Sequence, residues 1–220
     1  MARELRRPVD TAEFNRLALT PIKKRLAASW WNLRWAAHDK PGQLYFATVS
    51  GRLTPASGKV PCLYLAPNRE TSFYEIYGDL VDAGKKRGQE PRFSRKELEE
   101  RVYLKTTAPV TVNLYDLTAS RSAKKIGMDL ATLYSPDVSF PREFAQRLHD
   151  HPAKFDGIQY VSRHTQAPCL VLWATHNPAL NDVAMERGPS LWDLVKLDRA
   201  LVPGSLRLFD TVIQVATAPA

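Results

Sequence analysis

Cysteine is scarce in this 220-residue sequence, which has two, Cys62 and Cys169. Each lies in a short apolar run, and neither has the spaced cysteine or histidine neighbours that a zinc site needs. The pattern therefore excludes a disulfide framework, and no metal site is predicted. We expect two buried thiols that behave as small hydrophobic side chains, in a protein of the reducing cytoplasm.

Long hydrophobic runs are also missing. No apolar stretch approaches the length that crosses a bilayer. The N-terminal residues are charged and lack the apolar segment of a secretory signal. We therefore expect neither a membrane partner nor secretion.

Positive charge is in excess, with 31 lysines and arginines against 23 acidic residues and a formal net charge of +8. Such a balance suits nucleic acid, a membrane surface or an anionic small molecule. The basic residues form short scattered clusters, such as those at 3–7, 23–25, 85–87 and 124–125. Because no long basic run and no basic–aromatic repeat is present, direct contact with nucleic acid is not expected.

The length suits one domain with extensions. A hydrophobic content of 44% and an aromatic content of 10% provide a core. The pattern divides into an N-terminal helical extension over 1–29, a central domain over 30–175, and a C-terminal segment over 176–220. This last segment is expected to be helical, to end in a closing strand and to pack on the same domain.

The stretch from 51 to 80 predicts a loop, a strand and a helix. Cys62 to Ala66 is a short apolar run that Pro67 and Asn68 end. In the helix that follows, the apolar residues Phe73, Ile76, Tyr77 and Leu80 fall on one face, and Glu75 lies off that face.

The remaining elements are read from periodicity and capping signals. We expect helices after Thr11, near 22–28, after the capping box of Ser94 and Glu97, from Ser139 and over most of 178–203. We expect strands at 41–50, 102–106, 110–115, 158–163, 169–174 and 206–215. The strands at 102–106 and 110–115 are candidates for neighbours in one sheet.

Two polar residues stand out in apolar surroundings. Arg34 lies in a run with three tryptophans, where a charge needs either a partner or a cleft to point into. Ser162 lies near His164, which invites a hydrolase interpretation. That interpretation is not favoured, because the Gly-x-Ser-x-Gly elbow is absent and neighbouring strand residues point to opposite faces.

Several short motifs, taken together, resemble the RES-domain family of bacterial toxins, which pair with antitoxins. They occur in the family's order over about residues 30–175. The motifs are Leu33-Arg34, Gly51-Arg52-Leu53-Thr54-Pro55, Leu63-Tyr64-Leu65-Ala66 followed by Glu75, Asp116-Leu117-Thr118, and Asp156-Gly157-Ile158-x-Tyr160-x-Ser162-Arg163. The family name records an Arg, a Glu and a Ser, here Arg34, Glu75 and Ser162.

The resemblance implies an α+β fold similar to ADP-ribosyltransferase toxins, a single domain with a split mixed β core and flanking helices. It also implies destruction of intracellular NAD+ by cleavage of the nicotinamide–ribose bond, with water or inorganic phosphate as the acceptor. NAD+ would be the substrate, and no cofactor is implied. Within the resemblance, Arg34, Arg52, Tyr64, Glu75 and Ser162 line the NAD+ site.

The chemistry of NAD+ suits these residue types. Guanidinium groups such as Arg34 and Arg52 bind diphosphate oxygens, and Tyr64 can stack on the nicotinamide cation. Glu75 is the candidate carboxylate for the oxocarbenium-like ribose that forms as the bond breaks. Ser162 is expected to position the nicotinamide amide or the ribose, because no base is assured beside it. Arg34, Glu75 and Ser162 form the expected catalytic set.

Two other functions stay open at this point. The same donor site would serve a transferase that moves ADP-ribose onto a protein. A non-catalytic, DNA-associated module would instead use the basic surface and would not need Glu75. The resemblance further implies a helix-turn-helix antitoxin whose terminal segment plugs the cleft, and a homodimer is compatible with the sequence.

Overall fold

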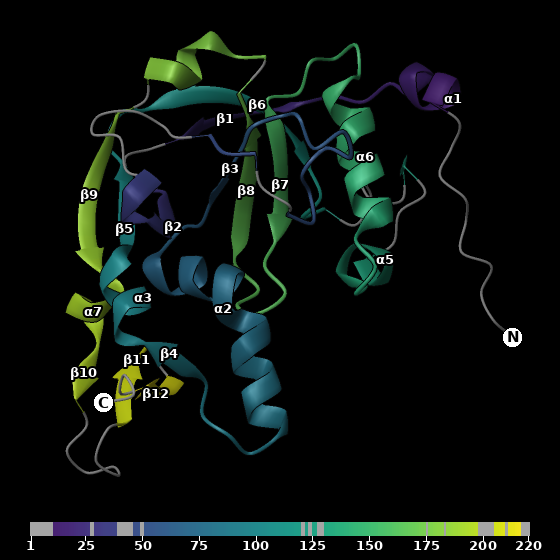
Figure 1. Cartoon of the computed structure of the whole chain (residues 1–220). Helices are drawn as coiled ribbons and strands as arrows, with labels where there is room; N and C mark the ends of the chain where they lie inside the picture. The colour runs from purple at the N-terminus through teal and green to yellow at the C-terminus, as the bar shows by residue number, and fades with distance from the viewer. Residues whose placement is uncertain are drawn as a thin grey trace, which may run out of the picture.

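Three β-sheets organise the part of the chain that the structure describes (Figure 1). The structure is a computed structural model, and the described residues are 11–26, 29–38, 46–48, 51–119, 122, 125–126, 130–174, 176–182, 184–197, 205–209 and 211–216. The helices are α1 (Thr11–Arg16), η1 (Ala36–His38), α2 (Arg69–Lys86), α3 (Arg95–Glu100), α5 (Leu130–Tyr134), α6 (Ser139–His149), η2 (Pro178–Asp182) and α7 (Leu191–Leu194). The strands are β1 (Ile22–Leu26), β2 (Trp31–Trp35), β3 (Cys62–Leu65), β4 (Arg92–Ser94), β5 (Arg101–Thr106), β6 (Val110–Asp116), β7 (Gly157–Val161), β8 (Pro168–Trp173), β9 (Met185–Ser190), β10 (Lys196–Leu197), β11 (Ser205–Leu208) and β12 (Thr211–Ala216).

The five-stranded sheet has the order β1-β6-β7-β8-β3, with β6 and β7 parallel and the other pairs antiparallel. Alternate side chains of β8 enter different cores, because neighbours on a strand point to opposite faces. Val171 and Trp173 pack with Phe144 of α6, whereas Leu170 and Leu172 belong to the core that includes residues of β5 and β9. Burial on both faces explains why β8 is apolar throughout.

The three-stranded sheet has the order β2-β5-β9 and is antiparallel. Helix α2 packs against β2 and is capped by Asn68, whose side chain accepts a 2.7 Å hydrogen bond from the Thr71 amide. Its buried face carries Phe73, Tyr77 and Val81, which enter a core shared with β4, β5 and the C-terminal strands.

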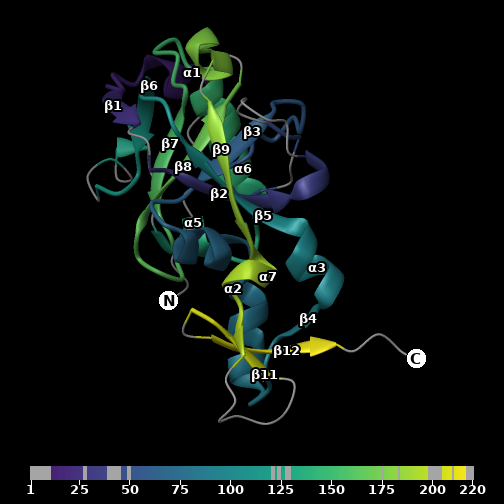
Figure 2. The same cartoon turned by 90° about the vertical axis from the view of Figure 1, so that its left-hand side faces the viewer.

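The third sheet has the order β10-β11-β12-β4 and lies beneath α3 and α7 in both views (Figures 1 and 2). Strands β10, β11 and β12 are antiparallel, whereas β12 pairs with β4 in parallel. Because β4 directly precedes α3, this sheet joins the end of the chain to its middle.

The α+β class with a split β core and flanking helices is confirmed. The capping box is also confirmed in its main contact, since Ser94 Oγ accepts a 3.0 Å hydrogen bond from the Glu97 amide. Both cysteines are buried, as expected, and burial raises the pKa of Cys62 to about 11. None of the helices in the described ranges is long and apolar enough to span a membrane.

Two predictions for the first half of the chain are wrong. Residues 22–26 form the edge strand β1 rather than a helix, because their alternating side chains suit pairing with the distant strand β6. The strands at 101–106 and 110–116 are not neighbours but lie in different sheets, each with partners from elsewhere in the chain. The predicted strand at 41–50 is described at residues 46–48 alone, where Ala47 forms an isolated bridge with Cys62.

The second half holds two more errors. Within 178–203, the described residues form η2, β9, α7 and β10 rather than a largely helical segment, because Gly188 and Pro189 disfavour a helix there and β9 pairs with β5. Residues 205–208 and 211–216 form two strands instead of one, and Phe209, which follows the first of them, has a φ of 55°.

Helix α2 also departs from its predicted face. Phe73 and Tyr77 are buried, but Ile76 and Leu80 are about 40% exposed. The helix presents a second face, away from its core, and that face carries Glu75 and Ile76 into the cavity described next.

Candidate active site

A cavity of about 940 Å³ is formed by residues of β2, β3, α2 and β7, together with the loop at 51–53. Four of the five predicted site residues line it: Arg34, Arg52, Tyr64 and Glu75. They come from four separate elements, and the sheets and α2 bring them together.

The Tyr64 hydroxyl braces the loop that carries Arg52. It accepts a 3.2 Å hydrogen bond from the Leu53 amide and lies 3.3 Å from Thr54 Oγ1. A Cβ at position 51 would collide with this hydroxyl, so glycine is required where the loop passes over the ring. Burial raises the pKa of Tyr64, and the phenol stays protonated at neutral pH. The strand tyrosine therefore shapes the cavity as well as lining it.

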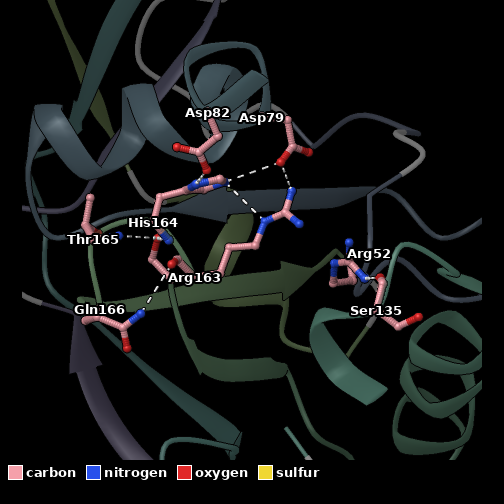
Figure 3. Close-up of polar contacts among 9 residues, drawn as sticks. Arg52, Asp79, Asp82, Ser135, Arg163, His164, Thr165 and Gln166 are labelled. Atoms are coloured by element: carbon pink, nitrogen blue, oxygen red, sulfur yellow. Dashed lines mark hydrogen bonds and ion pairs between the residues drawn. The ribbon is translucent and has the colours of Figure 1, made fainter. Parts of the chain in front are cut away.

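Arg52 is held by the C-terminal end of α5 and the residue that follows it. Its Nη1 donates a 3.1 Å hydrogen bond to the Leu133 carbonyl and another to the Ser135 carbonyl (Figure 3). Burial lowers the pKa of Arg52, and the nearby cation Arg163 lowers it further, but the group remains a guanidinium at neutral pH. Arg52 thus presents a positioned positive charge to the cavity.

Glu75 accepts a 2.5 Å hydrogen bond from the Tyr160 hydroxyl, which links α2 to β7. Tyr160 is buried, and both burial and the Glu75 carboxylate raise its pKa. A phenol in this state is a donor at neutral pH, so it orients the carboxylate it faces. Because both side chains line the cavity, Glu75 is a fixed negative group in a largely positive site.

Arg34 is buried in β2 and reaches the cavity wall. Its Nη1 donates a 3.5 Å hydrogen bond to the His38 carbonyl, and its Nη2 lies 3.4 Å from Met185 Sδ. The sequence left two alternatives for this residue, a charged partner or a cleft to point into. The geometry favours the second, because the core holds the side chain and Arg34 lines the cavity.

Ser162 is placed differently from the other four. It follows β7, is fully buried and does not line the cavity. Its Oγ accepts hydrogen bonds from the amides of His164 (3.3 Å) and Thr165 (3.4 Å), which fixes the turn between β7 and β8. In this structure the hydroxyl positions the residues that follow it.

Those residues form a polar cluster with α2 (Figure 3), and Arg163 and His164 line the cavity. Arg163 forms an ion pair with Asp79, and its Nε donates a 3.1 Å hydrogen bond to His164 Nε2. The His164 ring lies against Gly78, where a Cβ would clash with it, and its Nδ1 is 3.1 Å from Asp82. The cluster fixes the end of β7 to α2.

Positive charge exceeds negative charge around the cavity. The lining includes the arginines Arg34, Arg52, Arg101 and Arg163 against the carboxylates Glu75 and Asp79. An anionic ligand therefore suits the site. Among the described residues, no group of three or more histidine, cysteine or acidic side chains is placed to hold a metal ion.

Sequence reasoning missed some of the residues that line the cavity. Tyr160, which donates to Glu75, belongs to the motif at 156–163 but was not predicted as a site residue. The signal that could have identified it is its spacing, because residues two apart on a strand, such as Tyr160 and Ser162, lie on the same face. Trp35 and Arg101 also line the cavity. They are in contact only because β2 pairs with β5, and no local sequence pattern predicts this pairing.

Asp116-Leu117-Thr118, another of the quoted motifs, has a structural explanation. Asp116 Oδ1 accepts hydrogen bonds from the Thr118 amide (2.9 Å) and hydroxyl (2.6 Å), and from Gln159 Nε2 (3.2 Å). The motif closes β6 and ties it to β7, away from the cavity lining.

Comparisons with known proteins agree with this architecture. The chain is similar to a chain of the crystal structure of the M. tuberculosis MbcT–MbcA toxin–antitoxin complex, with a TM-score of 0.52 and 16% sequence identity, over 80% of this chain and 88% of that one. At this identity the likeness concerns the fold. The comparison with curated proteins gives no match. The RES domain model matches residues 23–194, and the chain therefore belongs to the RES domain family.

Proposed function

We propose that this protein is the toxin of a bacterial toxin–antitoxin pair and that it cleaves the nicotinamide–ribose bond of intracellular NAD+. The observation that carries the proposal is the Tyr160–Glu75 pair, a carboxylate fixed by a 2.5 Å hydrogen bond inside a cavity lined by four arginines. NAD+ combines an anionic diphosphate with a cationic glycosidic nitrogen, so it needs both kinds of charge.

The bond that breaks joins C1′ of the ribose to the nicotinamide nitrogen. The electron pair leaves with the nicotinamide, which becomes neutral, and the ribose gains oxocarbenium character. Glu75 stabilises this developing positive charge, as carboxylates do in glycoside hydrolysis. An oxygen of water or inorganic phosphate then bonds to C1′, and the proton of the acceptor passes to solvent. Because the leaving group is neutral, the step needs no acid to protonate it.

The other side chains bind and orient the substrate. Arg34 and Arg52 carry the guanidinium groups for the diphosphate, and the Tyr64 ring offers a face for the nicotinamide. Ser162 acts through the turn that it fixes, by placing Arg163 in the cavity lining. Tyr160 joins this set as the residue that orients Glu75.

The partner we propose is a helix-turn-helix antitoxin that covers the cavity mouth. Two of the exposed large apolar side chains, Ile76 and Val138, line the cavity, and Leu80 lies one turn further along α2. Apolar side chains around a cationic cleft suit a partner segment that enters it. The antitoxin, rather than this chain, would contact DNA.

The test is NAD+ consumption by the purified protein, with and without inorganic phosphate, beside the variant Glu75→Gln. Release of free nicotinamide that the variant loses by at least about 100-fold supports the proposal, since removal of a transition-state charge stabiliser typically costs this much. Dependence on phosphate identifies the acceptor.

Two results would contradict it. If folded wild-type protein leaves NAD+ intact both with and without phosphate, the proposed enzymatic activity is wrong. Nicotinamide release coupled to a labelled protein product would instead identify an ADP-ribosyltransferase.

A further inference from the structure

A tryptophan and an arginine are stacked in the wall of the cavity at the end of β2. Trp35 and Arg101 are partners in the antiparallel register of β2 and β5, and Arg101 Cζ lies 3.8 Å from the Trp35 ring centroid. This separation is that of a close cation–π contact. Arg101 Nε is buried and has no hydrogen-bond partner among the described residues. Both side chains are partly exposed and line the cavity.

The cavity extends past this pair. Trp35 also lines a second hollow of about 400 Å³, together with Ala36, Ala37, His38 and Glu100. Trp35 and His38 line both hollows, so the two are adjacent. The small alanine side chains leave room beside the indole for a flat group.

Similar pairs elsewhere in the described chain lack this setting. Arg69 lies over Trp31 at 4.4 Å, and Arg95 lies over Trp192 at 4.8 Å. None of these four residues lines either hollow. Cation–π packing is therefore a general device of this fold, but the Trp35–Arg101 pair is the example that faces a cavity.

We propose that the Trp35–Arg101 pair is the subsite for the adenine base of the dinucleotide, an inference that rests on the proposed cleavage of NAD+. The cavity is lined by a carboxylate, where Glu75 meets Tyr160 between α2 and β7, and by an aromatic side chain, Trp35, on the three-stranded sheet. NAD+ is two-ended, with nicotinamide riboside and adenosine joined by a diphosphate. In this assignment the nicotinamide ribose lies at Glu75, the diphosphate lies on the arginines and the base lies at Trp35, all of which line the same cavity.

Stacking is the interaction that this surface offers. A purine has a large π face, and base stacking on an aromatic side chain is worth a factor of about 5 to 150 in affinity. Arg101, in contact with the indole, adds a cation that favours an electron-rich base. The pair thus selects a dinucleotide over nicotinamide mononucleotide, which has no base at this end.

The experiment measures inhibition of NAD+ cleavage by ADP, which occupies the adenine end, and by nicotinamide, which occupies the other. We expect Trp35→Ala to raise the inhibition constant for ADP and the KM for NAD+ about 10-fold or more, with the constant for nicotinamide unchanged. Trp35→Phe keeps a ring and should retain most of the ADP affinity. Arg95→Ala, which removes a stacked arginine away from the cavity, is the matched control for Arg101→Ala.

The outcomes separate the two proposals. An unchanged ADP constant in Trp35→Ala and in Arg101→Ala, with active wild-type protein, overturns the subsite alone. If these variants weaken inhibition by ADP and by nicotinamide equally, the pair has a structural role, and the subsite proposal is also overturned. If Trp35→Ala does not fold, the Arg101→Ala constants decide by the same criteria. A wild-type protein that leaves NAD+ intact overturns the proposed function and the subsite with it.

Discussion

The Tyr160 hydroxyl donates a 2.5 Å hydrogen bond to the Glu75 carboxylate across 85 residues of sequence. This contact joins strand β7 to helix α2, which carries the candidate catalytic carboxylate. Since Tyr160 is buried and Glu75 is only partly so, the strand fixes one side of the carboxylate and leaves the rest to the cavity.

Tyr160→Phe should therefore impair catalysis more than folding. Loss of a hydrogen bond to a charged group corresponds to a fall in kcat/KM of about 10- to 100-fold. Steady-state kinetics and thermal unfolding of the same samples check this. Tyr103→Phe is the matched control, because Tyr103 is buried, donates to the Arg69 carbonyl at 3.0 Å and does not line the cavity. Equal kinetic losses in both variants would show that Tyr160 has no special role.

Gly51→Ala should destabilise the loop that carries Arg52, because the added Cβ collides with the Tyr64 hydroxyl. Overpacking of this kind costs about 1 to 3 kcal/mol in the free energy of unfolding. Urea denaturation measures it. The double variant with Tyr64→Phe removes the nearest clashing atom, so the two changes should cost less together than the sum of their separate costs. Strict additivity would mean that the two residues do not touch in solution.

Asp79→Asn should strengthen binding of an anionic substrate. Asp79 lines the cavity and pairs with Arg163, so its neutralisation leaves the arginine charge uncompensated. We expect a lower KM for NAD+, by about 2- to 5-fold at low ionic strength, with little change in stability, because exposed ion pairs contribute about 0 to 1 kcal/mol. Glu99→Gln breaks the Arg95–Glu99 surface pair and serves as the control. A KM that rises, or that falls equally in both variants, would argue against this role.

The stability of the protein should decrease as the pH falls below about 6.5, the ordinary pKa of histidine. Burial lowers the pKa of His151, whose Nδ1 accepts a 3.1 Å hydrogen bond from the Ala153 amide. A group with a depressed pKa in the folded state stabilises the protein above its unfolded pKa and loses that contribution as the pH falls. Unfolding free energies at pH 7.5 and 5.5 measure the difference.

His151→Phe should flatten that pH dependence. The ring lies between Phe14 and Phe155, at centroid distances of 5.9 and 5.7 Å, so an aromatic replacement fits the site without a titrating group. His38→Asn, at a more exposed histidine, is the control and should leave the slope unchanged. An unaltered slope in His151→Phe would assign the acid sensitivity to other groups, such as His176, whose pKa burial also lowers.

Local signals predicted the elements whose pattern is complete within a few residues. The Asn68 stop before α2 and the Ser94 cap of α3 depend on neighbours within three positions, and both are found. Strand β1 and the segment after 178 were assigned as helix because their true partners, β6 and β5, are distant in sequence. Pairing over such distances overrides local propensity.

The sequence by itself determined the chemistry available to this protein: two buried thiols, an excess of positive charge, and the motifs that hold Arg34, Arg52, Tyr64 and Glu75. Tertiary structure alone decided how these groups are used. It turned Glu75 toward Tyr160, stacked Arg101 on Trp35, and assigned the Ser162 hydroxyl to a turn rather than to the cavity. The reason is that each contact joins segments brought together by sheet pairing and helix packing, whose register depends on the whole core.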